Sequence, residues 1–208
     1  MSVQVKICGL NSPVAFDTAV EAGADWVGFV FFPPSPRHVT PSQAASLSGR
    51  FHGGPGRVGL FVDPSDGEVA AALDALRLDA LQVYASGARA VEIRARFGVP
   101  VWQAVGIGSA ADLPGAAEGV DRLLLEAKAP SGAGRPGGNA LVFDWSVLRG
   151  WRAPGPWMLA GGLTPGNVAA AIAATGAPAV DVSSGVEGAR GVKDPRLIRA
   201  FVGAVRGG

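Results

Sequence analysis

Two side chains with acid–base chemistry stand at the ends of apolar runs in this 208-residue sequence. Cys8 follows the run Val3–Ile7, and Glu126 follows the run Arg122–Leu125. A thiolate can act as a base or a nucleophile when its pKa is lowered. A carboxyl group behind three leucines is partly desolvated, which raises its pKa towards that of a useful general acid. Each also has a structural interpretation, since a buried cysteine can be inert and Glu126 could be an exposed partner of Lys128.

A second set of residues suits the anionic groups of a ligand. Arg37 follows the proline-rich segment Pro33–Pro36, and an arginine in such a loop is suited to binding a carboxylate through two parallel hydrogen bonds. The structural alternative is an arginine on the solvated surface. Two turns of small residues could hold a phosphate, because glycine lets backbone N–H groups come close to it. These turns contain Gly161, Gly162, Ser183, Ser184 and Gly185.

Eight short apolar runs predict strands that are covered on both faces, since their apolar residues are continuous rather than alternating. The runs are Val3–Ile7, Trp26–Phe31, Val58–Val62, Leu81–Val83, Val101–Val105, Arg122–Leu125, Trp157–Ala160 and Ala179–Val182. Alanine-rich amphipathic segments between them predict helices, several with a polar residue before and a glycine after. These are Pro13–Ala22 after Ser12, Glu68–Leu76 after Asp66, Ala88–Phe97, Pro165–Thr175 after Thr164, and Pro195–Val205 after Asp194, with weaker candidates near Ala110–Glu118 and Asp144–Leu148.

The alternation of strands and helices, at intervals of very roughly 25 residues, predicts a parallel α/β fold. A closed barrel and an open doubly wound sheet both fit this order. We predict one domain over residues 1–208, a single (β/α)8 TIM barrel, because eight strand–helix units are the number that closes. The residues singled out above then follow the carboxyl ends of strands, where the chemistry of this fold takes place. The helix expected near Pro165 would add the partial positive charge of its N-terminus to a phosphate site.

The composition excludes several classes of protein. Lys and Arg number 18 against 17 Asp and Glu, so charge gives no reason to expect binding to nucleic acid or to an anionic membrane. A single cysteine excludes an intramolecular disulfide and fits a reducing cytosol. No apolar run has the length of a signal-peptide core or a membrane span, so we expect a cytoplasmic protein. The only histidines, His38 and His52, are not neighbours, so we expect no metal site.

Motifs that occur in order from residue 5 to residue 194 resemble those of phosphoribosylanthranilate isomerase. They are Val5–Gly9, Gly23–Phe29 with Ser35–Arg37, Phe143–Trp145, Leu159–Leu163 with Asn167–Val168, and Asp181–Glu187 with Lys193–Asp194. The run Asp-Val-Ser-Ser-Gly-Val-Glu is the most specific of these motifs. The resemblance implies a barrel enzyme of tryptophan biosynthesis that needs no cofactor. Its reaction is the Amadori rearrangement of N-(5-phosphoribosyl)anthranilate to 1-(2-carboxyphenylamino)-1-deoxy-D-ribulose 5-phosphate.

The resemblance also implies roles for the matching residues. Cys8 is the base that removes the proton from C2′, and Glu126 stands at the position of the acid. Arg37 binds the anthranilate carboxylate, while Lys6 and Asp181 contact the substrate, the latter beside the sugar. The two turns of small residues hold the phosphate. The expected partner is therefore a small phosphorylated substrate, without nucleic acid or membrane, and the expected assembly is a monomer or a homodimer.

The sequence departs from the family pattern at three places. Glu126 stands where the family has an aspartate, so the acid is one methylene longer, and a misplacement of ~1 Å can cost on the order of 10²-fold in rate. Tyr84 stands where the family has a histidine, and it either forms a hydrogen bond there or merely packs. The run Gly137–Ala140 replaces a Gly-Gly-Thr-Gly run within the long flexible segment 127–140.

These departures leave two alternatives open. One is an isomerase that acts on another aminoaldose phosphate, and Arg37 argues against it, because that arginine then has no carboxylate to bind. The other is a phosphate-binding barrel that has lost catalysis. The presence of Cys8 argues against this second alternative, whereas Glu126 is the residue that keeps it open.

Overall fold

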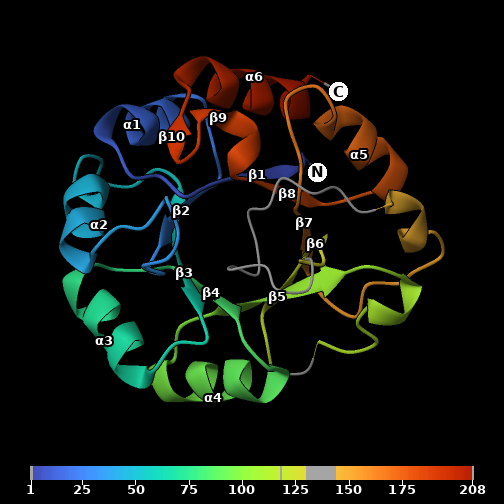
Figure 1. The fold of residues 1–208 in the computed structure, drawn as a ribbon, viewed down its shortest axis with the longest axis horizontal. Helices are drawn as coiled ribbons and strands as arrows, with labels where there is room; N and C mark the ends of the chain where they lie inside the picture. The colour runs from blue at the N-terminus through green and yellow to red at the C-terminus, as the bar shows by residue number, and fades with distance from the viewer. Residues whose placement is uncertain (1, 118, 130–143, 208) are drawn as a thin grey trace.

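Eight parallel strands form a closed barrel in sequence order, and helices cover its outside (Figure 1). The computed structural model describes residues 2–117, 119–129 and 144–207. The strands are β1 (Gln4–Cys8), β2 (Trp26–Val30), β3 (Gly56–Val62), β4 (Ala80–Tyr84), β5 (Val101–Ile107), β6 (Arg122–Ala127), β7 (Trp157–Leu159) and β8 (Ala179–Val182). The barrel closes between β1 and β8, where Lys6 pairs in register with Asp181. The predicted barrel is confirmed, and the open doubly wound sheet is wrong.

The outer layer consists of helices that begin at polar capping residues. They are α1 (Pro13–Glu21), α2 (Pro41–Ser48), α3 (Asp66–Ala75), α4 (Gly87–Phe97), α5 (Val168–Thr175) and α6 (Pro195–Arg206). Ser12 and Asp194 cap α1 and α6 as expected, since their side-chain oxygens accept backbone N–H groups of the first turn. None of the described helices is long and apolar enough to cross a membrane.

Several helix predictions need correction. The segments Ala110–Asp112 and Trp145–Leu148 form only short 3-10 turns, while Glu118 lies outside the described residues. Pro114 ends the first of these segments early, because proline disfavours the helical conformation of the residue before it. In α3 the cap is Ser65, which exchanges reciprocal hydrogen bonds with the residue three positions on, so Asp66 is already the first helical residue. No helix was predicted where α2 lies.

Alternate residues of each strand face the helices and the barrel interior. Val5 and Ile7 of β1 belong to the large buried cluster that also contains Phe16 of α1 and Phe201 of α6. Lys6, which lies between them, therefore faces the barrel interior. Burial on both faces explains why the strands have continuous apolar runs. A polar residue at an inward position of such a run is consequently held near the axis of the barrel.

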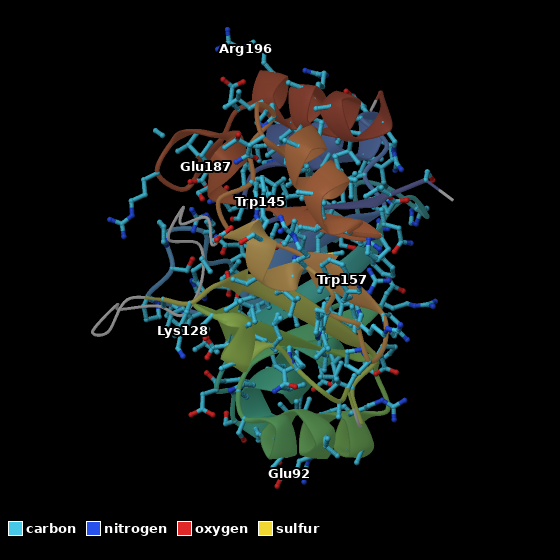
Figure 2. All side chains as sticks on the ribbon, turned by 90° about the vertical axis from the view of Figure 1, so that its right-hand side faces the viewer. Glu92, Lys128, Trp145, Trp157, Glu187 and Arg196 are labelled. Atoms are coloured by element: carbon cyan, nitrogen blue, oxygen red, sulfur yellow. The ribbon has the colours of Figure 1, made fainter. Side chains whose placement is uncertain are left out.

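The two ends of the barrel interior differ in character. At the amino ends of the strands, the rings of Trp26 and Trp102 meet edge to face with centroids 4.8 Å apart, and the guanidinium of Arg122 stacks over Trp102 at 4.7 Å. The carboxyl ends carry the longer loops with charged side chains. Figure 2 shows Glu187 and Lys128, which follow β8 and β6, at the same end of the molecule. The fold thus gathers the predicted functional residues at the carboxyl end of the barrel.

Candidate active site

A buried lysine lies inside the barrel near the carboxyl end of β1. Lys6 is fully buried, and its ammonium group donates hydrogen bonds to Gln82 Oε1 at 2.9 Å and to Asp181 Oδ1 at 2.7 Å. Burial alone would lower the pKa of Lys6, but the Asp181 carboxylate, together with the negative charge of Cys8 when its thiol is deprotonated, outweighs it, so the pKa is raised. Lys6 therefore remains positively charged beside the thiol.

Cys8 lies one inward position further along β1, and only 3% of its surface is exposed. Gly28 of β2 makes room for the sulfur, because a Cβ at that position would lie 2.9 Å from Sγ. Burial raises the pKa of the Cys8 thiol, whereas the charge of Lys6 acts against this rise. The resting group is therefore a protonated thiol, with a cation beside it that stabilises the thiolate when it forms.

Glu126 is buried near the carboxyl end of β6, with 6% of its surface exposed. The alternative of an exposed glutamate is therefore wrong, and Lys128 forms an ion pair with Asp112 at 2.9 Å. Glu126 interacts with Tyr84 at the end of β4. Burial, the charge of Glu126 and a hydrogen bond with it raise the pKa of Tyr84 well above its usual value, and Cys8 acts in the same direction. Tyr84 thus lies near both predicted catalytic groups.

The chain of hydrogen bonds from Lys6 through Gln82 to Tyr84 has a fixed direction. An ammonium group only donates, so Gln82 must accept with Oε1 and donate with Nε2, which lies 3.4 Å from the Tyr84 hydroxyl oxygen. The single hydroxyl proton of Tyr84 is then free to be donated to the Glu126 carboxyl group. Tyr84 therefore has a hydrogen-bonding role and does not merely pack.

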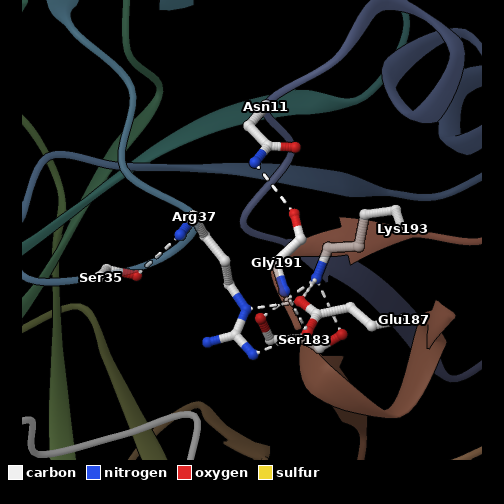
Figure 3. A network of polar contacts seen from close by, with 7 residues as sticks. All are labelled: Asn11, Ser35, Arg37, Ser183, Glu187, Gly191 and Lys193. Carbon is white, nitrogen blue, oxygen red and sulfur yellow. Dashed lines mark hydrogen bonds and ion pairs between the residues drawn. The ribbon is translucent and has the colours of Figure 1, made fainter. Parts of the chain in front are cut away.

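Arg37 does not lie on the solvated surface, since only 4% of it is exposed. Its guanidinium donates from Nε to Glu187 Oε1 at 2.6 Å and from Nη2 to Glu187 Oε2 at 3.0 Å (Figure 3). The expected pair of parallel hydrogen bonds is present, but the acceptor is a carboxylate of the chain itself. Glu187 begins β9 (Glu187–Ala189), which pairs with β10 (Val192–Lys193) in a hairpin. No local pattern in the sequence indicates this contact, because 150 residues separate its partners.

Lys193 belongs to the same cluster of polar side chains as Arg37 and Glu187, and it also contacts the loop after β8. Its ammonium donates to Ser183 O at 2.8 Å, to Ser183 Oγ at 3.3 Å and to Glu187 Oε1 at 2.9 Å. Burial lowers the pKa of Lys193, against the opposing effect of Glu187. Burial would raise the pKa of Glu187, but the hydrogen bond from Arg37 and the charge of Lys193 lower it to about 2. Two cations and one anion leave this group with one net positive charge.

The two turns of small residues lie against each other. Gly161 and Gly162 have φ of 83° and 64°, a region that favours glycine. Asn167 holds this turn, since its side chain accepts from Thr164 N at 2.7 Å and donates to Gly162 O at 3.0 Å. The backbone of Gly185 packs directly on Leu163. The first helical residue is Val168, so the prediction of a helix from Pro165 is wrong and the turn does not open directly into a helix.

Replacing Gly185 with alanine tests the close packing of these two turns. The added Cβ would overlap the carbonyl oxygen of Leu163, so one turn must move. We expect the free energy of unfolding to fall by about 1–3 kcal/mol, measured by urea denaturation. Gly203→Ala is the matched control, because no heavy atom lies within 4 Å of a Cβ at that helical position. An equal effect of both substitutions would contradict the packing of the turns.

Comparison with known proteins assigns a family to this arrangement. The family model described as N-(5′phosphoribosyl)anthranilate (PRA) isomerase matches residues 5–204. The chain belongs to the N-(5′-phosphoribosyl)anthranilate isomerase family. A curated relative of that name from Acidiphilium cryptum is 58% identical over 201 residues, covering 97% of each chain. The crystal structure of TrpF from Jonesia denitrificans is 38% identical with a TM-score of 0.84, covering 99% of this chain and 98% of the other.

A further solved structure shows a ligand complex of a phosphoribosyl anthranilate isomerase. It contains reduced 1-(o-carboxyphenylamino)-1-deoxyribulose 5-phosphate, and it is 31% identical to this chain with a TM-score of 0.81, covering 99% of each chain. The present chain is accordingly an enzyme, an intramolecular isomerase of the aldose–ketose type. In this isomerase the side chains of Lys6, Cys8 and Asp181 lie close together. Gly137–Ala140 and Phe143 lie outside the described residues.

No group of three His, Cys, Asp or Glu side chains within the described ranges could hold a metal ion. The polar groups of the isomerase instead form two sets. One set runs from Asp181 through Lys6 and Gln82 to Tyr84 and Glu126, inside the barrel. The other joins Arg37, Glu187 and Lys193 above it. The first set suits the movement of protons, and the second, with its net positive charge, suits an anion.

Proposed function

We propose that this chain converts N-(5′-phosphoribosyl)anthranilate to 1-(2-carboxyphenylamino)-1-deoxyribulose 5-phosphate, the third step from chorismate to tryptophan. The observation that carries the proposal is the buried thiol of Cys8 beside the ammonium of Lys6, at the end of the barrel where two glycine-containing turns adjoin. Membership of the isomerase family supports the identity of the substrate. We assign the base to Cys8 and the acid to Glu126.

The first step opens the sugar ring. Glu126 donates its proton to the ring oxygen, the bond between C1′ and that oxygen breaks, and the lone pair of the anthranilate nitrogen forms a C1′=N iminium ion. The hydroxyl of Tyr84 donates to one oxygen of Glu126, so the proton to be transferred is carried by the other oxygen. This arrangement directs the acidic proton towards the ligand.

The second step moves the double bond. The Cys8 thiolate takes the proton from C2′, and the electron pair of the C–H bond forms the C1′=C2′ double bond of an enolamine while the nitrogen becomes neutral. The enolamine then gains a proton at C1′ and loses one from the 2′-hydroxyl, which gives the ketone. The active protonation state, with a Cys8 thiolate and a protonated Glu126, is restored when the proton held by Cys8 returns to Glu126. Both steps are proton transfers, so the proposed mechanism uses no cofactor.

Binding of the substrate uses the groups around these two residues. We assign the phosphate to the turns of Gly161 and Gly162 and of Ser183, Ser184 and Gly185, whose backbone N–H groups can approach it closely. Asp181 and Lys6 face the sugar from below. Arg37 keeps Nη1 free of hydrogen bonds to described residues, and we assign this nitrogen to the anthranilate carboxylate.

A direct assay tests the proposed function. Freshly prepared phosphoribosylanthranilate is fluorescent because of its anthranilate group, and isomerisation is expected to abolish this fluorescence. We expect the purified protein to accelerate the loss in proportion to its concentration, with the ketone product identified by mass spectrometry and borohydride reduction. Loss no faster than the spontaneous breakdown of the substrate would contradict the proposal. Turnover of a phosphoribosylamine without the carboxylate, at an equal kcat/KM, would contradict the assigned substrate.

A further inference from the structure

Arg37 is held in place along its whole length. Its backbone N–H donates to Ser35 Oγ at 3.2 Å, and its side-chain stem packs so closely on Gly9 that a Cβ there would lie 2.6 Å from Arg37 Cδ. Gly9 directly follows Cys8, so the stem of the arginine lies against the residue next to the thiol. The direction of the guanidinium beyond this stem is then decided by Glu187 (Figure 3).

The hydrogen-bonding capacity of Glu187 is filled. Oε1 accepts from Arg37 Nε and Lys193 Nζ, and Oε2 accepts from Arg37 Nη2 and from the backbone N–H of Gly191 at 2.9 Å. Four bonds occupy the four lone-pair sites of a carboxylate. A pKa of about 2 keeps this group ionised across the physiological range. Glu187 is therefore a fixed acceptor that leaves no capacity for a ligand.

The hydrogen-bonding capacity of Lys193 is also fully used. Its three ammonium protons have three acceptors, namely Ser183 O, Ser183 Oγ and Glu187 Oε1. Among the described residues of this cluster, the guanidinium of Arg37 thus keeps three N–H groups for an anion, two on Nη1 and one on Nη2. One net positive charge and these neighbouring donors fit one carboxylate.

We propose that Glu187 is a positioning residue that aims Arg37 Nη1 at the substrate carboxylate and, through Lys193, fixes this donor relative to the Ser183 turn. The proposal rests on the proposed function, which assigns the carboxylate to Arg37 and the phosphate to the turns. In this arrangement the two anion-binding groups keep a constant separation. The site therefore selects ligands whose carboxylate and phosphate are spaced to match, rather than any phosphate ester.

Two stable ligands separate carboxylate recognition from all other binding. One is the reduced product analogue, a secondary amine that carries both phosphate and carboxylate. The other is its counterpart with phenyl in place of carboxyphenyl. The carboxylate ratio is the Kd of the phenyl ligand divided by the Kd of the carboxyphenyl ligand, each measured by titration calorimetry. It reports the carboxylate contact alone, because damage to the fold or to the phosphate turns affects both ligands. We expect Arg37→Met to reduce this ratio to near one.

For Glu187→Gln we expect the ratio to fall about tenfold, as for the loss of one well-placed charge-assisted hydrogen bond. The Kd of the phenyl ligand should stay within about threefold of its wild-type value. The extra positive charge left at Arg37 and Lys193 attracts the phosphate without specificity, which is a small effect. Glu187→Asp, which keeps the charge on a shorter stem, should retain an intermediate ratio. Asp194→Asn is the matched control for the loss of a carboxylate directly after the hairpin, since asparagine also caps α6.

The outcomes separate the inference from the proposed function. A wild-type ratio in Glu187→Gln, together with a collapsed ratio in Arg37→Met, would overturn the positioning role and leave the substrate assignment intact. Equal weakening of both ligands by Glu187→Gln would also overturn it, because that pattern indicates general structural damage. A wild-type ratio in Arg37→Met would remove the carboxylate from Arg37 and with it this part of the proposed function.

Discussion

Replacement of Cys8 with alanine is expected to lower kcat about 10³-fold, the usual contribution of a positioned proton-transfer group. The thiolate is the base that we assign to removal of the C2′ proton, and the sequence contains no other cysteine that could replace it. The loss of fluorescence of phosphoribosylanthranilate measures the effect. Binding of the reduced product analogue should change by less than about tenfold, since Lys6, Asp181 and the phosphate turns remain.

Two comparisons make the Cys8 prediction specific. Cys8→Ser keeps the shape of the side chain but offers a far weaker base, so it should be almost as inactive as the alanine variant. In the wild type, the rate at which iodoacetamide alkylates Cys8 should increase with pH through the titration of the thiol, because only the thiolate reacts. Burial raises the pKa of Cys8, so this increase should extend above the usual range of a thiol. Near-normal kcat in Cys8→Ala would remove the residue from the mechanism.

Replacement of Glu126 with glutamine is expected to lower kcat by about 10²- to 10³-fold. Glutamine has the same length and can still accept the hydrogen bond from Tyr84, but its amide cannot donate an acidic proton to the ring oxygen. The KM should change little, since the substitution removes an interaction of the transition state rather than of the bound substrate. Single-turnover measurement of ring opening would place the loss at the first step.

Glu126→Asp is the companion to this prediction. Aspartate keeps the acid but shortens its reach, and it should retain measurable turnover, well above that of glutamine. The shorter aspartate lies farther from Tyr84, so adding Tyr84→Phe to Glu126→Asp should not change its activity. The same Tyr84→Phe substitution in the wild-type background should lower activity. A double-mutant cycle over these two positions measures that coupling. Equal activity of Glu126→Gln and the wild type would exclude Glu126 as the acid.

The sequence was sufficient to predict the barrel and to place the candidate site residues at one end of it. Continuous apolar runs locate all eight strands because both of their faces are buried, and a parallel barrel puts the residue after each strand at one end. Cys8, Glu126 and the glycine-containing turns could be found in this way. Ser12 and Asp194 were found as caps because capping depends on residues within one turn of a helix.

The partners of these residues could not be predicted from the sequence. The contact between Arg37 and Glu187 spans 150 positions, and that between Lys6 and Asp181 spans 175, so neither leaves a local pattern. The pattern of a polar residue followed by proline at Thr164 also misplaced the start of α5, because Asn167 closes the turn with side-chain hydrogen bonds and delays the helix. Burial of Glu126 beside Tyr84 likewise depends on the closed interior rather than on neighbours in the chain.

The pairing of β1 with β8, which closes the barrel, also governs when this enzyme can become active during its synthesis. The ribosome makes Lys6 and Cys8 long before Asp181, which lies 175 positions after Lys6. Until the final strand emerges, the ammonium of Lys6 has no carboxylate to balance its charge, and an unpaired cation resists burial. The nascent chain therefore keeps its thiol outside a finished interior, and catalytic competence arises only once β8 has left the ribosome and paired with β1.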